Sequence, residues 1–247
     1  MRYLPLTKLE RHDMMESLGI TNQEELYNEI PSDFIYKGQF DLDNHQTESA
    51  VENKLKALAD KNISTNEYSC FLGAGSYKHH IPSSVDHIIQ RAEFLTSYTP
   101  YQPEISQGTL VSIFEFQSYI CNLTGQDVAN ASMYDGATSL VEAILMAKRI
   151  KKKAKSIIAN DINSDYYRVL QGYFDGSEII NNINYDGSDV AAIIVQTPDF
   201  YGTPHSLSKY RELADKLDAL LIVSVTEVVS LGLLPAPQEA DIVTGEA

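Results

Sequence analysis

Two nearly uninterrupted apolar runs constrain the fold of this chain more than any other feature: residues 190–196 (VAAIIVQ) and residues 219–225 (ALLIVSV). Strands that are apolar on both faces are buried on both faces, which is typical of a parallel sheet covered by helices. Weaker signals alternate with these runs: strands at 156–159, 178–183 and 241–244, and helices at 164–172 and 206–218. The alternation predicts an α/β fold of three layers, built on a doubly wound, mostly parallel sheet.

The beginning of the chain has a different pattern, which predicts a helical N-terminal arm (residues 1–65) ahead of the α/β domain (residues 66–247). Thr21 and Glu24 have the spacing of a capping box that opens a short helix. A second, polar helix is predicted at 47–61. Its thin apolar stripe consists of Val51, Leu55 and Leu58. We expect such a helix to wrap a larger body or a partner chain rather than to form a core.

Three further helices are predicted between the arm and the sheet. Ser83 and Asp86 cap the first. The second ends at Gly125, and the third follows the small-residue turn 130–138 (NASMYDGAT). The second carries Leu110, Ile113, Phe114, Gln117, Ile120 and Cys121 at helical spacing, and the third carries Leu140, Ala143, Ile144 and Ala147.

The charge balance excludes one class of partner. With 34 acidic and 19 basic residues the net charge is −15, which argues against nucleic acid because phosphate backbones are bound by clustered Lys and Arg. The one basic run, residues 148–155 (KRIKKKAK), ends a predicted helix, where cations complement the helix dipole. We therefore interpret this run as a solvated helix end.

The sequence also predicts a cytoplasmic protein with no membrane association. Cys70 and Cys121 share no metal or redox spacing and lie beside apolar residues, so we expect buried, reduced thiols. The first residues turn charged without the apolar stretch of a signal peptide. No apolar run reaches the length that spans a bilayer.

Residues 98–108 (YTPYQPEISQG), here called the tyrosine loop, hold the clearest candidates for function. Pro100 and Pro103 fix their own φ angles and bias the preceding residues toward extended backbone, so the loop is stiff. Its polar side chains are Tyr98, Tyr101, Gln102, Glu104 and Gln107. Binding and catalytic groups concentrate on such loops. The residues alone leave two interpretations open: a connector whose tyrosines pack on their own domain, or the wall of a functional site.

Two other patterns are weaker. The small-residue turns at 73–76 and 135–138 precede helices and would suit the phosphate of a cofactor, but neither matches a P-loop or a dinucleotide fingerprint, and a tight turn is the commoner explanation. His79 and His80 suggest a metal site, but no Asp, Glu or Cys is spaced to complete one. We expect structural or interface histidines and no metal.

Taken together, several segments resemble one family, the glycine cleavage system P-protein (glycine decarboxylase), and within it the N-terminal half or subunit 1. The segments are 71–82 (FLGAGSYKHHIP), 93–110 (EFLTSYTPYQPEISQGTL), 130–138 (NASMYDGAT), 230–234 (SLGLL) and 240–246 (ADIVTGE). The resemblance covers nearly the whole chain. It implies a fold like the large domain of fold-type-I pyridoxal-phosphate transferases. It also implies a C-terminally truncated fragment, since the family chain is nearly twice this length.

The function implied by the resemblance belongs to a complex. A second subunit holds pyridoxal phosphate, glycine is decarboxylated there, and the aminomethyl group passes to the lipoyl arm of the H-protein. The tyrosine loop would supply a wall of that site: the phenols bond cofactor or carboxylate oxygens, and Glu104 orients groups or accepts a proton if burial raises its pKa. We expect the chain alone to be inactive.

The lysines argue that the cofactor is not held by this chain. A pyridoxal enzyme needs a lysine for its Schiff base, and in the fold class that this chain resembles the lysine follows a late strand. No lysine follows Lys216, although strands are predicted at 219–225 and 241–244.

Two departures from the family pattern point the same way. Where the family has Q-N-P-N-F-x-G, this chain has Thr197 and Asp199; where it has A-D-P-x-S-L, this chain has Glu227. Cofactor-holding relatives use an Asp at that strand end to pair with the pyridine nitrogen, and Glu227 is one methylene longer. Both changes fit a vestigial site better than a working one. Two alternatives remain open: a non-catalytic scaffold subunit, and a stand-alone pyridoxal enzyme whose lysine lies in a missing C-terminal half.

Overall fold

The computed structural model describes residues 6–71, 73 and 77–246, and the chain divides into two units, Met1–Ile63 and Ser64–Ala247. The first unit contains helices α1 (Lys8–Leu18) and α2 (Glu48–Ala59) and two 3₁₀ helices, Gln23–Tyr27 and Ser32–Phe34. No residue of this unit that the structure describes is buried. It therefore builds no core of its own.

The capping box predicted in this unit is displaced by one residue. Asn22, not Thr21, is the N-cap: its Oδ1 accepts the N–H groups of Glu24 and Glu25 at 3.0 and 3.2 Å. Glu25 closes the box on the N–H of Asn22. The element is a 3₁₀ helix, and Thr21 donates its hydroxyl to Glu25 from outside it.

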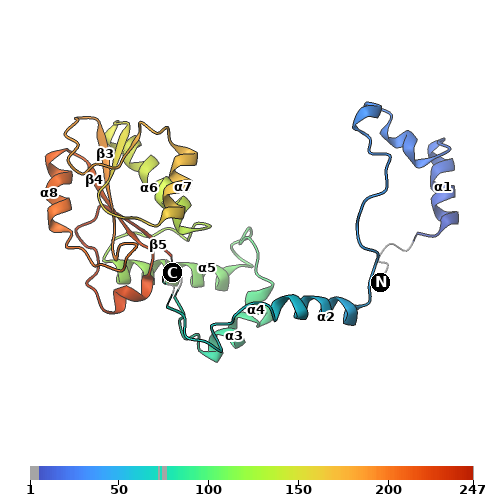
Figure 1. The fold of residues 1–247 in the computed structure, drawn as a ribbon, viewed down its shortest axis with the longest axis horizontal. Helices are drawn as coiled ribbons and strands as arrows, with labels where there is room; N and C mark the ends of the chain where they lie inside the picture. The colour runs from blue at the N-terminus through green and yellow to red at the C-terminus, as the bar shows by residue number, and fades with distance from the viewer. Residues whose placement is uncertain (1–5, 72, 74–76, 247) are drawn as a thin grey trace. The chain divides into compact units, whose positions relative to one another are not determined.

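The second unit holds the sheet and the remaining helices (Figure 1). Its helices are α3 (Ser83–Ile89), α4 (Ala92–Leu95), α5 (Gln107–Thr124), α6 (Gly136–Lys151), α7 (Ser164–Tyr173) and α8 (Ser208–Lys216). Its strands are β1 (Lys155–Ile158), β2 (Ile179–Ile180), β3 (Val190–Gln196), β4 (Leu220–Val225) and β5 (Ile242–Gly245). The strand order is β2-β1-β3-β4-β5, and all neighbouring strands are parallel. The predicted α/β fold is confirmed.

The helices cover both faces of the sheet, as Figure 1 shows. Leu140 and Ile144 of α6 and Leu170 of α7 pack against one face, whereas Tyr210 and Ala214 of α8 pack against the other. The faces differ because the step from β1 to β2 and the step from β3 to β4 run in opposite directions across the sheet, so right-handed crossovers place α7 and α8 on opposite faces. Ligands of such sheets bind at the carboxyl ends of the strands, where the strand order reverses.

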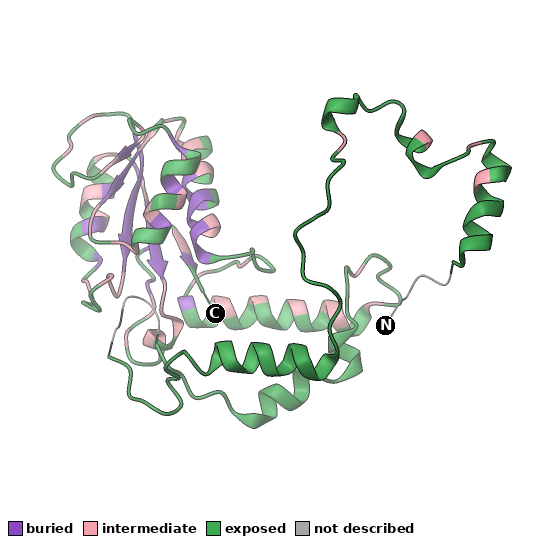
Figure 2. Ribbon diagram, turned by 45° about the vertical axis from the view of Figure 1, so that its right-hand side comes forward, coloured by how far each residue is buried: buried purple, intermediate pink, exposed green. Residues whose placement is uncertain are grey.

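Burial is concentrated in this sheet and in α6 (Figure 2). All seven residues of β3 are buried, in accordance with its continuous apolar sequence. β2 is shorter than predicted, because the chain turns after Ile180: Oδ1 of Asn182 accepts the N–H of Asn184, and its carbonyl accepts that of Tyr185.

Three local expectations are wrong. The basic run 148–155 is not a solvated helix end: Lys148 pairs with Glu178, and Lys151 and Lys153 pair with Asp218, with the three lysine side chains largely buried. Cys70 is exposed and Cys121 is half-buried. The side chain of Ser83 makes no cap, and the N-cap of α3 is Pro82.

Some apolar side chains of helix α5 are left exposed in the described part of the chain. Most of its predicted stripe is partly buried, but Phe114 is 69% exposed, and Val111 and Tyr119 beside it are exposed as well. Gly125 ends the helix in the left-handed conformation, as predicted. No helix in the described part of the chain is both long and apolar enough to cross a membrane.

Candidate functional site

The carboxyl ends of β1 and β3 are joined by side-chain amides. Asn160, just after β1, donates its Nδ2 to the carbonyl of Gln196 at 2.7 Å and accepts the N–H of Gln196 at 3.0 Å. The buried Gln196 side chain accepts the N–H of Asn163 and donates to the carbonyl of Pro198. These bonds fill the point where the strand order reverses, so this edge of the sheet is rigid.

The loop that leaves β3 is held by an acid–base pair. Oδ2 of Asp199 lies 2.8 Å from Nε2 of His205, and Oδ1 of Asp199 accepts the N–H groups of Tyr201 and Thr203, each at 2.9 Å. Burial alone would raise the pKa of Asp199, but the bonds from His205 and the two N–H groups outweigh it and lower the pKa below its ordinary value. Asp199 is therefore an ionised carboxylate, and its hydrogen bonds hold the loop closed.

The carboxyl end of β4 holds a segment from far upstream. Glu227, just after β4, places Oε2 3.2 Å from Nε2 of His79, and its Oε1 accepts the N–H of Val229. The histidine expected to be structural thus contacts the strand end, while His80 is exposed. No cluster of three His, Cys, Asp or Glu suited to a metal occurs among the residues that the structure describes.

The turn at 135–138 begins α6, as its sequence predicts. Asp135 is the N-cap, and its Oδ1 accepts the N–H of Thr138 at 2.8 Å. The other predicted turn, 73–76, lies outside the described residues except for Gly73.

A second carboxylate lies over the same helix end. The hydroxyl of Tyr166, on α7, donates to Oε1 of Glu246 at 2.5 Å, and both side chains press on Gly136, where an added Cβ would lie 1.9 Å from the hydroxyl and 2.7 Å from Cγ of Glu246. Burial raises the pKa of Tyr166, and the bond to Glu246 and the charge of Asp135 raise it further. The hydroxyl therefore keeps its proton and acts as the donor.

A cavity of about 580 Å³ opens beside this contact, bounded by residues of α5, of the segment 126–136, of α6 and of β5. The part at the helix end, here called the α6 cup, is lined by Asp135, Gly136, Ser139, Thr244 and Glu246. The hydroxyl of Thr244, a residue that is 6% exposed, has no hydrogen-bond partner. Because residues two apart in a strand share a face, Thr244 and Glu246 both lie on the α6 side of β5.

Pyridoxal phosphate, the cofactor implied by the family resemblance, does not fit this edge of the sheet. Its phosphate would meet the carboxylates of Asp135 and Glu246 at the start of α6. The carboxylate of Glu227, at the strand end that pairs with the pyridine nitrogen in cofactor-holding relatives, already contacts His79. Carboxylates repel a phosphate placed beside them, and this repulsion makes the free energy of phosphate binding less favourable.

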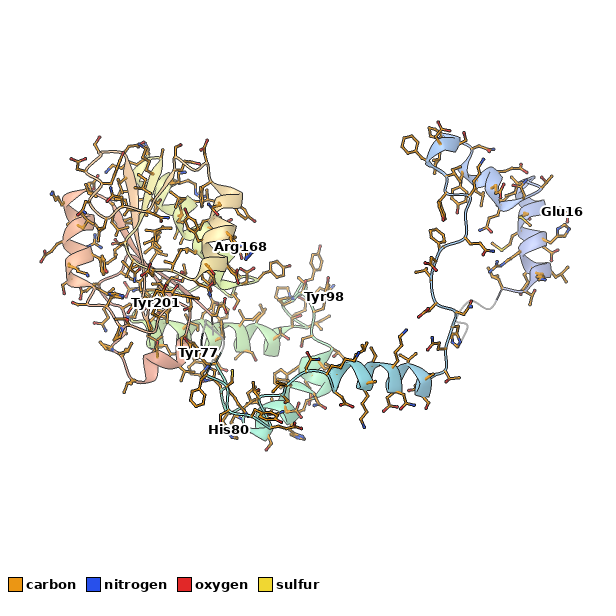
Figure 3. The ribbon with its side chains drawn as sticks, viewed as in Figure 1. Glu16, Tyr77, His80, Tyr98, Arg168 and Tyr201 are labelled. Atoms are coloured by element: carbon orange, nitrogen blue, oxygen red, sulfur yellow. The ribbon has the colours of Figure 1, made fainter. Side chains whose placement is uncertain are left out.

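The tyrosine loop has the irregular backbone predicted for it, up to the start of α5 at Gln107. Tyr98 and Tyr101 are 91% and 88% exposed, and Figure 3 shows the Tyr98 side chain projecting from the ribbon. Gln102 and Glu104 are also exposed, and Gln107 donates its amide to the carbonyl of Glu104 at 3.1 Å. Four of the five candidates lie on the irregular part of the loop and Gln107 is the first residue of α5, and the two tyrosines do not pack against the described part of the chain.

The loop borders a second cavity, of about 620 Å³. Its apolar lining comes from Phe94, Ile105, Ile113 and Phe116. Exposed phenols beside an apolar hollow are typical of a surface that a partner or ligand covers. Glu104 is exposed in the described structure, so any burial of its carboxylate has to come from such a covering surface.

Sequence reasoning missed Tyr166, Glu246 and His205. Tyr166 lies in an ordinary amphipathic helix, and no local spacing links it to Glu246, 80 positions away. The pairing of His205 with Asp199 had a detectable signal, because an acid and a histidine six residues apart flank the turn Thr203-Pro204 at a strand end.

Comparison with known proteins agrees with these features. The family model for the glycine cleavage system P-protein matches residues 1–247. The probable glycine dehydrogenase (decarboxylating) subunit 1 of Maricaulis maris is 43% identical over 260 residues, and that of Geobacillus thermodenitrificans is 40% identical over 261 residues. These alignments cover 100% and 99% of this chain and 58% of each relative.

A solved structure agrees as well. The crystal structure of a glycine decarboxylase (P-protein) in inhibitor-bound form superposes with a TM-score of 0.83 at 35% identity, covering 100% of this chain and 58% of that one. The chain thus spans 58% of the length of the relatives that it matches. Because the family model matches throughout, the chain belongs to the glycine cleavage system P-protein family.

Proposed function

We propose that this chain acts as subunit 1 of glycine decarboxylase, together with a second subunit that holds pyridoxal phosphate. The pair decarboxylates glycine and passes the aminomethyl group to the lipoyl arm of the H-protein. The support is the match to curated subunit 1 proteins along the whole chain and the fold shared with a solved P-protein. Activity, substrate and partners are inferred from those longer relatives.

The tyrosine loop is the observation that carries the proposal. Its phenols are exposed on a backbone stiffened by Pro100 and Pro103, so little conformational freedom is lost when a partner covers them. Facing the second subunit, Tyr98 and Tyr101 donate hydrogen bonds to oxygens of the substrate or cofactor, and Gln102 and Gln107 offer amides. Glu104 is then covered as well, where its carboxylate orients groups or accepts a proton.

Exposed apolar side chains of α5 support the partner. Val111 and Phe114 are neighbours one helical turn apart, Tyr119 is exposed further along the helix, and exposed apolar surface of this kind marks protein interfaces. We infer that the second subunit covers this surface, which continues from the end of the tyrosine loop.

The cofactor is proposed for the second subunit because the residues of this chain disfavour it. The carboxylates of Asp135 and Glu246 lie where a phosphate would bind, and Glu227 contacts His79.

The test is glycine-dependent exchange of labelled bicarbonate with purified H-protein and the second subunit, with and without the full-length form of this chain. We expect exchange only in the mixture. Exchange by the second subunit alone would make this chain a non-catalytic scaffold, and exchange by this chain alone would refute the placement of the cofactor.

A further inference from the structure

The start of α6 combines features that favour an anion with one that opposes it. The helix has 16 residues, and its first N–H groups form the positive end of the helix dipole, which attracts phosphate. The glycine at its first position, Gly136, is buried, and without a Cβ it lets the Tyr166 and Glu246 side chains lie directly against the helix backbone. The nearby hydroxyl of Thr244 is buried without a partner and is available as a donor.

The opposing feature is the Glu246 side chain. Its carboxylate lies against Gly136 on the open side of the backbone, and the hydroxyl of Tyr166 holds it there. Tyr166 is only 6% exposed and belongs to another helix, and its hydroxyl directs the carboxylate of the exposed Glu246 toward the start of α6. A negative charge thus lies in the α6 cup where an incoming anion would approach.

We infer that Glu246 is a specificity-determining residue: its carboxylate closes the α6 cup of this chain to phosphate-bearing ligands. This inference rests on the proposed function, in which the cofactor belongs to the second subunit. Glu246 then ensures that the two related folds of the complex do not compete for one cofactor. Asp135 also lines the cup, but its Oδ1 accepts the N–H of Thr138 as the helix cap, so Glu246 is the carboxylate that can be removed without uncapping α6.

The experiment measures binding of inorganic phosphate to the complex of the full-length chain with its cofactor-loaded second subunit, by isothermal titration calorimetry. Glu246→Ala removes both the charge and the bulk from the α6 cup. Glu246→Gln removes the charge but keeps the shape and a hydrogen-bond acceptor for Tyr166, so it guards against a variant that is merely misfolded. Glu212→Ala, at an exposed carboxylate of α8, is the control for the change in net charge.

We expect the natural chain and Glu212→Ala to bind phosphate equally weakly. Glu246→Ala should bind it at least tenfold more tightly, and Glu246→Gln should also bind it more tightly than the control. If both Glu246 variants bind phosphate no better than Glu212→Ala, the inference is wrong. Phosphate binding needs no turnover, so a failed bicarbonate exchange would count against the proposed function and leave this result standing.

Discussion

Nε2 of His79 lies 3.2 Å from the carboxylate of Glu227, across 148 positions of the sequence. The contact fastens the segment around His79 to the carboxyl end of β4. From the sequence, the change from the family's Asp to Glu227 was interpreted as decay of a cofactor site. In the structure the longer Glu227 side chain has a structural role, because its carboxylate contacts His79 and also accepts the N–H of Val229.

This contact predicts an energetic coupling between the two residues. A double-mutant cycle with His79→Ala and Glu227→Gln should give a coupling of roughly 0.2–1 kcal/mol, the range of solvent-accessible ion pairs. The value is small because the His79 side chain is about half exposed. Urea denaturation of the four proteins measures it, and strictly additive effects would show that the segment is not held by this pair.

The Asp199–His205 pair predicts a dependence of stability on pH. Because the pKa of folded Asp199 is lowered, its contribution is present above the unfolded pKa of about 3.9 and is lost as the pH falls through the folded value. Asp199→Asn should cost about 1–3 kcal/mol at neutral pH, since it removes a charged partner of His205 from a largely buried site. The cost should begin to shrink below about pH 4, where the carboxyl of the unfolded chain takes up a proton, and should disappear once the pH has fallen below the lowered pKa of the folded carboxyl.

Urea midpoints of both proteins across this pH range provide the measurement. Asp165→Asn is the matched control, because the Asp165 carboxylate is exposed and pairs only with the exposed Arg168. Its effect should stay within about 0.5 kcal/mol at every pH. A cost for Asp199→Asn that does not change between neutral and acid pH would contradict the assignment.

Replacement of glycine by alanine should have opposite effects on stability at two positions of the chain. A Cβ at Gly245 would lie 2.5 Å from the carbonyl oxygen of Val225, a backbone atom that cannot move without disturbing the β4–β5 pairing. Gly245→Ala should therefore destabilise the chain by about 1–3 kcal/mol. Gly172→Ala, at an exposed position of α7 with open space around it, should stabilise it by about 0.5–1 kcal/mol. Thermal unfolding of both variants checks the signs, and equal effects would rule out the steric explanation.

The tyrosine loop predicts a loss of activity without a loss of stability. The triple variant Tyr98→Phe, Tyr101→Phe, Glu104→Gln should unfold within about 0.5 kcal/mol of the natural chain, because all three side chains are exposed. In the complex, bicarbonate exchange should fall by about a hundredfold, the lower range for loss of acid–base groups. Tyr173→Phe, an exposed phenol at the end of α7, is the control. Full exchange activity of the triple variant would exclude the loop from the site.

The sheet was predictable because its signal is local. The apolar run 190–196 coincides with β3, and the buried face of α6 contains the four predicted residues Leu140, Ala143, Ile144 and Ala147. Both patterns arise because the positions shielded from solvent carry apolar residues. These positions follow the periodicity of the strand or helix, so the sequence of the element itself displays them. The turn at Asp135 was also predictable, because Asp is a preferred residue at the N-cap of a helix and Asp135 directly precedes the glycine at which the helix begins.

The contacts at the sheet edge were not predictable, because they join residues that only the fold brings together. Tyr166 meets Glu246 only once α7 and β5 are in place, and His79 meets Glu227 across most of the chain. The basic run at 148–155 was misread for the same reason: nothing near it in the sequence indicates that Glu178 and Asp218 neutralise it. In the function proposed above, the role of the tyrosine loop depends on a surface outside this chain.

The uncovered side of α5 has a consequence for protein supply in the cell. A newly made copy shows Val111, Phe114 and Tyr119 to the solvent until another surface arrives, and such copies are held by chaperones or removed by proteases. We therefore expect the steady-state amount of this chain to follow the amount of whatever covers α5, even when its own synthesis is raised.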